Sequence, residues 1–242
     1  MKGIIIIPGL GCNPNWYKGI SKKTSKLFTT IILDWFSSNA KTIKDIVKLI
    51  EHARNKNNIT KCFLIGHSLG GIFTFIYQYY YPKNTLGLYI IDSHFVNNIP
   101  NKKSKEEMKK IINGTVLNGK YKNKIQKWYN KVDYIKFFNY LQITYKWLTK
   151  NKINIKNIII YGTISTDEII KKGHRVLDSK KLFVLSETAK KIIEYESNFN
   201  LLILSNTDHW TFMNKHKKQV FEHIIYFLQN NKNIYSGIIL FK

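Results

Sequence analysis

The segment that most constrains the fold has the sequence GHSLGG at residues 66–71, with Ser68 between glycines. It follows the apolar run CFLI at residues 62–65, and a further apolar stretch comes after it. This order predicts a buried strand, a sharp turn with Ser68 at its tip, and then a helix. Glycines near the serine let the backbone and the neighbouring strands approach closely. Because the strand and the helix are both expected, we interpret Ser68 as an exposed nucleophile rather than part of a chance glycine-serine loop.

The rest of the chain alternates short apolar runs with segments of helical periodicity. The apolar runs are rich in β-branched residues and bounded by glycine, proline or polar residues, which is typical of strands buried on both faces. Strands separated by helices in this order predict an α/β fold with a mostly parallel, doubly wound sheet. We expect strands at 4–7, 30–33, 62–65, 86–91, 158–161 and 201–204, and helices around 17–28, 42–54, 69–81, 186–197 and 214–228.

The alternation stops after the strand that ends near Ile91. From 95 to 156 the sequence has lysine-rich helical stretches and no strand pattern. An insertion of this length in an α/β domain usually forms a cap or lid over the site. We therefore expect a core made of residues 1–94 and 157–242, with a helical cap at 95–156.

The expected cap is unusually rich in aromatic residues. We expect most of them to pack inside the cap, while some could line an apolar pocket or touch a lipid surface. The set comprises Trp128, Tyr129, Tyr134, Phe137, Phe138, Tyr140, Tyr145 and Trp147.

The formal net charge is +24, and nearly all of the positive charge is lysine, since the only arginines are Arg54 and Arg175. One interpretation is attraction to anionic lipid or nucleic acid. The other is the codon bias of an A/T-rich genome, which makes Lys, Asn and Ile abundant together. We favour codon bias because the lysines are spread along the chain and arginine would suit phosphate recognition better. Contact with an anionic lipid surface stays open, and nucleic acid is not expected as a partner.

The remaining composition excludes several classes of protein. Cys12 and Cys62 lie in or beside apolar runs and predict no disulfide framework. Residues 1–8 do not resemble a signal peptide, because their apolar core is short and ends at Pro8. No stretch approaches the length of a membrane span, and the sequence lacks metal-ligand spacings, phosphate loops and dinucleotide glycine patterns. We expect a cytoplasmic protein without a cofactor or metal.

A nucleophilic serine needs a base to take its proton, and that base needs an acid to orient it. In a parallel sheet, the loops that leave the carboxyl ends of the strands meet at one edge. We predict that His209 is the base, because it stands in the loop after the last expected strand. The acid is Asp167, after the strand at 158–161, or Asp92, at the end of the strand at 86–91. We choose Asp167 and keep Asp92 as the alternative, since Asp92 could instead brace its own loop by hydrogen bonds to backbone N–H groups.

The tetrahedral intermediate of such a reaction needs N–H donors for its oxyanion. We expect one donor to be the backbone N–H of Leu69, which follows the nucleophile at the start of a helix, where the helix dipole also helps. The second donor should come from the loop after the first strand, and there we choose the N–H of Leu10.

These motifs resemble the α/β-hydrolase superfamily, in particular its lipase, esterase and thioesterase branch with a lid. The resemblance implies a serine hydrolase that cleaves a carboxylic ester of acyl or lipid type through an acyl-enzyme, with Ser68, His209 and Asp167 as its triad. The same residues serve thioesterases and acyltransferases, and a non-catalytic binding protein of this fold is a further alternative. The antiparallel first strands of the family have no counterpart in this chain. The resemblance rests on GHSLGG at 66–71, YP at 81–82, LYIID at 88–92 and DH at 208–209.

Overall fold

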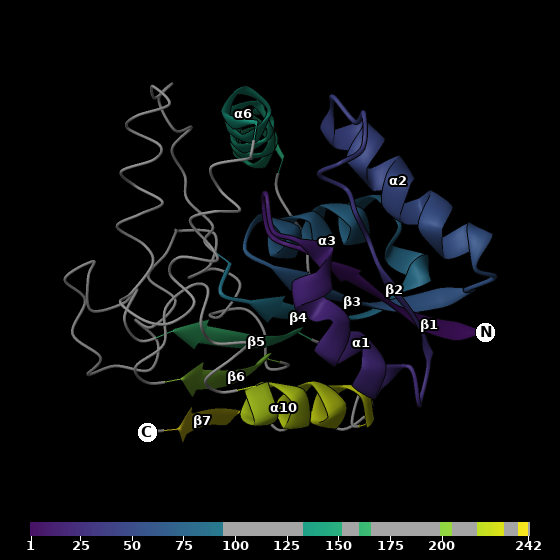
Figure 1. Cartoon of the computed structure of the whole chain (residues 1–242), viewed down its shortest axis with the longest axis vertical. Coiled ribbons are helices and arrows are strands. Elements are labelled where there is room, and N and C mark those ends of the chain that lie inside the picture. The colour runs from purple at the N-terminus through teal and green to yellow at the C-terminus, as the bar shows by residue number, and fades with distance from the viewer. Residues whose placement is uncertain (94–132, 152–159, 166–198, 205–216, 230–236, 242) are drawn as a thin grey trace.

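Parallel strands form one sheet through the middle of the molecule (Figure 1). The computed structural model describes residues 1–93, 133–151, 160–165, 199–204, 217–229 and 237–241, and every structural statement below concerns these ranges. The sheet has seven strands in the order β2-β1-β3-β4-β5-β6-β7, and each neighbouring pair is parallel. The strands are β1 (Lys2–Ile7), β2 (Thr29–Ile32), β3 (Lys61–His67), β4 (Thr85–Ile91), β5 (Ile160–Ser165), β6 (Phe199–Leu204) and β7 (Gly237–Phe241).

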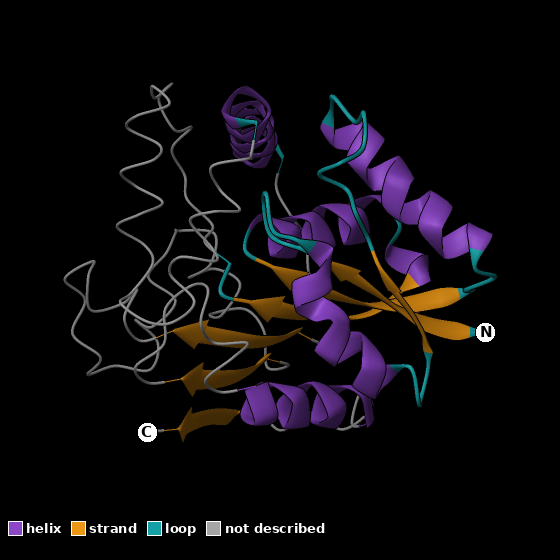
Figure 2. Cartoon of the chain, in the orientation of Figure 1, coloured by secondary structure: helices purple, strands orange, loops and turns teal. Residues whose placement is uncertain are grey.

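Helices cover both faces of the sheet, as Figure 2 shows in purple beside the orange strands. The α-helices α2, α3 and α6 contribute to one apolar core, and α1 and α10 contribute to the other. The prediction of a doubly wound α/β sheet is therefore confirmed. The α-helices are α1 (Lys18–Thr24), α2 (Ile43–Lys56), α3 (Leu69–Tyr80), α6 (Tyr134–Lys150) and α10 (Lys217–Gln229), and the short 3-10 helices are η1 (Pro14–Tyr17) and η2 (Pro82–Asn84).

The two cores follow from the period-two alternation of strand side chains. In β1, Ile5 and Ile7 belong to the core beneath α2 and α3, whereas Ile4 and Ile6 belong to the core beneath α1 and α10. The pairing register carries this alternation across the sheet, since Ile5 pairs with Leu64 of β3. Burial on both faces explains why these strands are continuous apolar runs.

Several predicted boundaries move in the structure. The expected helix around 17–28 is wrong in its extent, because the chain forms η1 and then a short α1 that ends at Thr24. The strand expected at 158–161 is β5, which runs on to Ser165 through residues that the sequence suggested were loop. The strand β7 at the edge of the sheet was not expected at all. The helix expected around 186–197 lies outside the described residues.

A polar network ties α2 to α3 near the amino ends of the strands. The Tyr77 hydroxyl donates to Glu51 Oε2 at 2.6 Å, and the Arg54 guanidinium donates to both carboxylate oxygens of Glu51, at 2.8 and 2.6 Å. Arg54 also donates to the backbone carbonyls of Ile59 and Thr60, just before β3 begins. The carboxylate and the guanidinium are largely buried, and each satisfies the other, as buried charges require.

Within the predicted cap at 95–156, only residues 133–151 are described, and there the chain forms α6. Asp133 begins the helix by accepting hydrogen bonds from the N–H groups of Ile135 and Lys136. Four of the aromatic residues pack into the core shared with α2 and α3: Phe137, Phe138, Tyr140 and Tyr145. The boundaries of the cap stay a prediction. None of the described helices is long and apolar enough to cross a membrane.

Candidate active site

Ser68 stands at the junction of β3 and α3, on a backbone that L-residues rarely adopt. Its φ is 53° and its ψ is −125°. It occupies the N-cap position of α3, yet its side chain makes no capping hydrogen bond to that helix. A serine at an N-cap ordinarily accepts a bond from the first turn. The Ser68 hydroxyl therefore does not cap the helix. A strained strand-to-helix elbow holds a nucleophilic serine in the same way.

The glycines around Ser68 are required by close backbone contacts. A Cβ at Gly66 would lie 2.5 Å from the carbonyl oxygen of Gly70 and from Cα of Gly71. A Cβ at Gly70 would collide with the carbonyl oxygens of Ile7 and Pro8, where β1 ends. The elbow is therefore pressed against the end of β1, and side chains at these positions would force them apart.

The loop after β1 comes directly beside the nucleophile. A Cβ placed on Gly9 would lie 3.1 Å from Cβ of Ser68 and 2.8 Å from Nδ1 of His67. Residues far apart in the sequence are thus brought together at the carboxyl edge of the sheet, where ligands of open α/β sheets bind.

Both expected oxyanion residues lie in this region. Leu69 is the first residue of α3, so its N–H has no partner within the helix and points from the positive end of the helix dipole. Leu10 follows Gly9 in a tight turn that the N–H of Cys12 closes by donating to Gly9 O at 3.0 Å. Gly11 has a φ of 68°, the left-handed conformation that a type II turn needs at its third position.

The triad itself is only partly within the described residues. Asp167 and His209 lie outside them, so the structure places neither. Asp92 is described: it directly follows β4, is 3% exposed and has a φ of 44°. The N–H of Ser68 donates to Ile91 O at 2.8 Å, so Asp92 begins its loop beside the elbow. Asp92 therefore stays the alternative acid.

Two other histidines have structural surroundings. His223 of α10 is buried, and its Nδ1 lies 2.8 Å from the hydroxyl of Tyr89 in β4. Burial lowers the pKa of His223 to about 4, which keeps the ring neutral at pH 7. His67 is also buried, with Nδ1 2.6 Å from the hydroxyl of Tyr17. His67 thus links the residue before Ser68 to Tyr17.

Sequence reasoning missed two residues that contact the loop after β1. The Tyr17 hydroxyl accepts a hydrogen bond from the N–H of Gly9 at 3.2 Å, and the Trp35 indole N–H donates to Pro8 O at 2.8 Å. A buried aromatic residue with a polar tip needs a partner for that tip. Nothing in the sequence identifies these partners, because Tyr17 stands at the end of η1 and Trp35 in the loop after β2.

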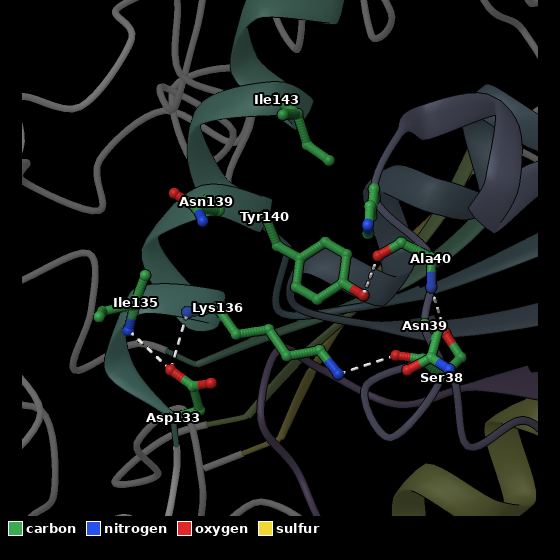
Figure 3. Close-up of a pocket in the computed structure, with 10 residues that line it drawn as sticks. Ser38, Asn39, Ala40, Asp133, Ile135, Lys136, Asn139, Tyr140 and Ile143 are labelled. Atoms are coloured by element: carbon green, nitrogen blue, oxygen red, sulfur yellow. Dashed lines mark hydrogen bonds between the residues drawn. The ribbon is translucent and has the colours of Figure 1, made fainter.

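A pocket of about 710 Å³ lies between α6 and the loop after β2 (Figure 3). Lys136 reaches across it and donates to Ser38 O, and the Tyr140 hydroxyl donates to Ala40 O, each at 2.8 Å. Ser68 and Leu10 are not among the residues that line this pocket. Its polar contacts fasten α6 to the loop after β2. Among the described residues, no group of three or more His, Cys, Asp or Glu could hold a metal ion.

Comparison with known families agrees with this arrangement. A sequence profile of the alpha/beta hydrolase fold matches residues 3–139, more than half of the chain. The chain therefore belongs to the α/β-hydrolase family, which confirms the resemblance drawn from its motifs. No curated protein matches the sequence.

Solved structures share the fold at low sequence identity. A hydrolase from Oleispira antarctica has a TM-score of 0.67 at 15% identity, covering 95% of this chain and 92% of its own. A thermophilic esterase from Thermogutta terrifontis has a TM-score of 0.66 at 10% identity, covering 96% and 91%. A carboxylesterase structure from the thaumarchaeon Nitrososphaera gargenis has a TM-score of 0.62 at 16% identity, covering 95% and 90%. At these identities the likeness establishes the fold alone.

Proposed function

We propose that the protein is a serine hydrolase that cleaves a carboxylic ester, of acyl or lipid type, through a covalent acyl-enzyme. Ser68 is the nucleophile, His209 the base and Asp167 the acid that orients it, with Asp92 as the alternative acid. The N–H groups of Leu10 and Leu69 stabilise the oxyanion. The chemistry needs no cofactor or metal.

The observation that carries this proposal is the backbone of Ser68. A φ of 53° strains a non-glycine residue, and the hydroxyl gives up its capping bond to α3. A serine with only a structural role gains nothing from this conformation. The closeness of the loop after β1 adds support, since Gly9, the neighbour of the expected donor Leu10, lies beside Ser68.

The reaction follows from these roles. His209 takes the proton of Ser68 while the serine oxygen attacks the ester carbonyl, and the negative charge develops on the carbonyl oxygen. The protonated base then gives its proton to the leaving alcohol as the carbon–oxygen bond breaks, which leaves the acyl group on Ser68. Water, which gives its proton to the same base, then attacks the acyl group on Ser68 and releases it as a carboxylic acid.

The solved structures that share the fold include a carboxylesterase and an esterase, and we choose a carboxylic ester by analogy with them. Thioesters and acyl transfer use the same groups, because only the leaving group or the final acceptor changes. A non-catalytic binding role is the candidate from another class, and the strained backbone of Ser68 argues against it. The high positive charge would suit a substrate with an anionic head group or a site near anionic lipid.

A substrate panel tests the proposal. Hydrolysis of p-nitrophenyl esters of increasing acyl length and of acyl thioesters should be measured for the wild type and for Ser68→Ala. We expect clear preference for one chain length and one leaving group, and loss of turnover by at least about a thousand-fold in Ser68→Ala. Turnover that survives Ser68→Ala would remove the assignment. Turnover of the best ester by Asp167→Asn and by Asp92→Asn identifies the triad acid. Replacing the triad acid should lower turnover far more than replacing the other aspartate.

A further inference from the structure

We propose that Tyr17 and Trp35 are positioning residues for the oxyanion donor, because they hold the Pro8–Gly9 peptide unit from opposite sides and so fix the direction of the Leu10 N–H. This inference rests on the proposed function and names a device of the same site that the motifs do not contain.

Both contacts involve one peptide unit. The carbonyl of Pro8 and the N–H of Gly9 belong to the same planar group, and they point in opposite directions because its bond is trans. The Trp35 indole N–H donates to that carbonyl at 2.8 Å, and the Tyr17 hydroxyl accepts from that N–H at 3.2 Å. Two side chains from different segments thus resist rotation of this peptide plane in either sense.

This restraint reaches Leu10 through the next peptide unit. The next peptide unit joins the carbonyl of Gly9 to the N–H of Leu10, and that carbonyl accepts from the N–H of Cys12 at 3.0 Å. In a trans peptide the Leu10 N–H must point away from this bond, out of the turn. Only Gly9 lies between the peptide held by the two side chains and the peptide that carries the donor. Its missing Cβ leaves room for Ser68 beside it.

Tyr17 is itself held by a contact with His67. Its hydroxyl has one proton and can accept two bonds. Since it already accepts from Gly9, its proton can be given to Nδ1 of His67, 2.6 Å away. Burial raises the pKa of Tyr17 well above its ordinary value, with the nearby Cys12 adding to the shift, so the proton stays on the phenol. His67 stands next to Ser68, and the chain of bonds therefore runs from the elbow through Tyr17 to the oxyanion loop.

Trp35 is held by contacts with two other aromatic rings. Its ring is 1% exposed and meets Phe73 of α3 edge-on at 4.8 Å between centroids, and Tyr140 of α6 at 5.0 Å. The indole is thus fixed between the helix that follows the nucleophile and a helix of the predicted cap. These two edge-on contacts hold the indole in the orientation in which its N–H donates to Pro8 O.

The test is Tyr17→Phe, which keeps the buried ring and removes the hydroxyl. Tyr89→Phe is the matched control, because Tyr89 is also fully buried in the same core and its hydroxyl also meets a histidine Nδ1, at 2.8 Å from His223. Trp35→Phe acts on the other end of the same peptide unit and keeps an aromatic ring against its neighbours. For each variant, kcat and KM on the best ester, the inhibition constant of a trifluoromethyl ketone of the same acyl length, and Tm are measured.

We expect Tyr17→Phe and Trp35→Phe each to lower kcat by about ten- to a hundred-fold, with KM changed by less than about three-fold. The ketone, whose adduct with Ser68 carries the oxyanion, should bind more weakly by a similar factor. Tyr89→Phe should lower Tm to a similar extent and leave kcat and ketone binding within about two-fold of the wild type.

Two results would overturn the inference, and they differ from failure of the proposed function. If Tyr17→Phe and Trp35→Phe lose no more activity than Tyr89→Phe, the contacts only stabilise the fold. If kcat falls while ketone binding is unchanged, the contacts serve another step than oxyanion stabilisation. If the wild type cleaves no ester or thioester and binds no ketone, the proposed function itself fails and the inference falls with it.

Discussion

Replacing Ser68 by glycine and by alanine should separate the strain of the elbow from the chemistry of its hydroxyl. Both variants lack the nucleophile, so neither should turn over substrate. Alanine must keep a φ of 53° and a ψ of −125°, which costs a residue with a Cβ about 1–3 kcal/mol. Glycine adopts this conformation freely but loses about 0.5–1 kcal/mol through the greater entropy of its unfolded chain. The net expectation is that Ser68→Gly has the higher free energy of unfolding, by about 1 kcal/mol, the difference of these ranges.

Urea unfolding followed by circular dichroism gives this difference, and in a chain of this size 1 kcal/mol shifts Tm by about 2–4 °C. The control is the same pair of substitutions at Ser25, which has a φ of −64° at the end of α1. There the order should reverse, with glycine less stable than alanine by about 0.5–1 kcal/mol. If glycine is also the less stable variant at Ser68, the backbone there is not strained, and the main support for the nucleophile is lost.

Other predictions concern stability. Glu51→Gln should lower the free energy of unfolding by about 2–4 kcal/mol in urea titrations, because it leaves Arg54 without its buried counter-charge. Tyr77→Phe removes one hydrogen bond and should lower the free energy of unfolding by about 1–2 kcal/mol. Equal losses in the two variants would contradict the network. Although burial works to raise it, the hydrogen bonds from Arg54 and Tyr77 lower the pKa of Glu51. Its stabilisation should therefore be complete above the unfolded pKa of about 4.3 and be lost as pH falls through the lower folded value, and Glu51→Gln should lack this loss. Burial lowers the pKa of His223 to about 4. Between about pH 6.5 and pH 4 this histidine is therefore protonated in the unfolded chain and neutral in the folded protein. The free energy of unfolding should fall by roughly 3 kcal/mol as pH drops through that window. His223→Asn should flatten this dependence, and an unchanged profile would show that another group causes it.

The fold and the strand-to-helix elbow at Ser68 were predictable because local sequence determines them. The apolar runs of β1, β3 and β4 are continuous since both faces of the sheet are covered, and the glycines near Ser68 are required by contacts within a few residues or with the next strand. The family motif at the elbow adds a spacing that is typical of a strand-turn-helix. These features place Ser68 and Leu69 without any knowledge of distant contacts.

The residues and backbone conformations that hold the site in place could not be predicted in this way. Tyr17, at the end of η1, and Trp35, in the loop after β2, contact the loop after β1. Neither has a sequence pattern that distinguishes it from other buried aromatic residues. The positive φ of Asp92 could not be predicted either, because aspartate indicates a left-handed backbone less strongly than glycine does. The edge strand β7 was missed because one short apolar run near the end of the chain resembles many others.

The central claim is that Ser68 is an activated nucleophile, and covalent labelling tests it most directly. The wild type is treated with an alkyl fluorophosphonate, and the modified residue is found by peptide mass spectrometry. We predict a single adduct on Ser68, absent in Ser68→Ala and formed at least about a hundred-fold more slowly in His209→Ala, because the base no longer takes the serine proton. A wild type that stays unlabelled, or that is labelled at another residue, would contradict the claim.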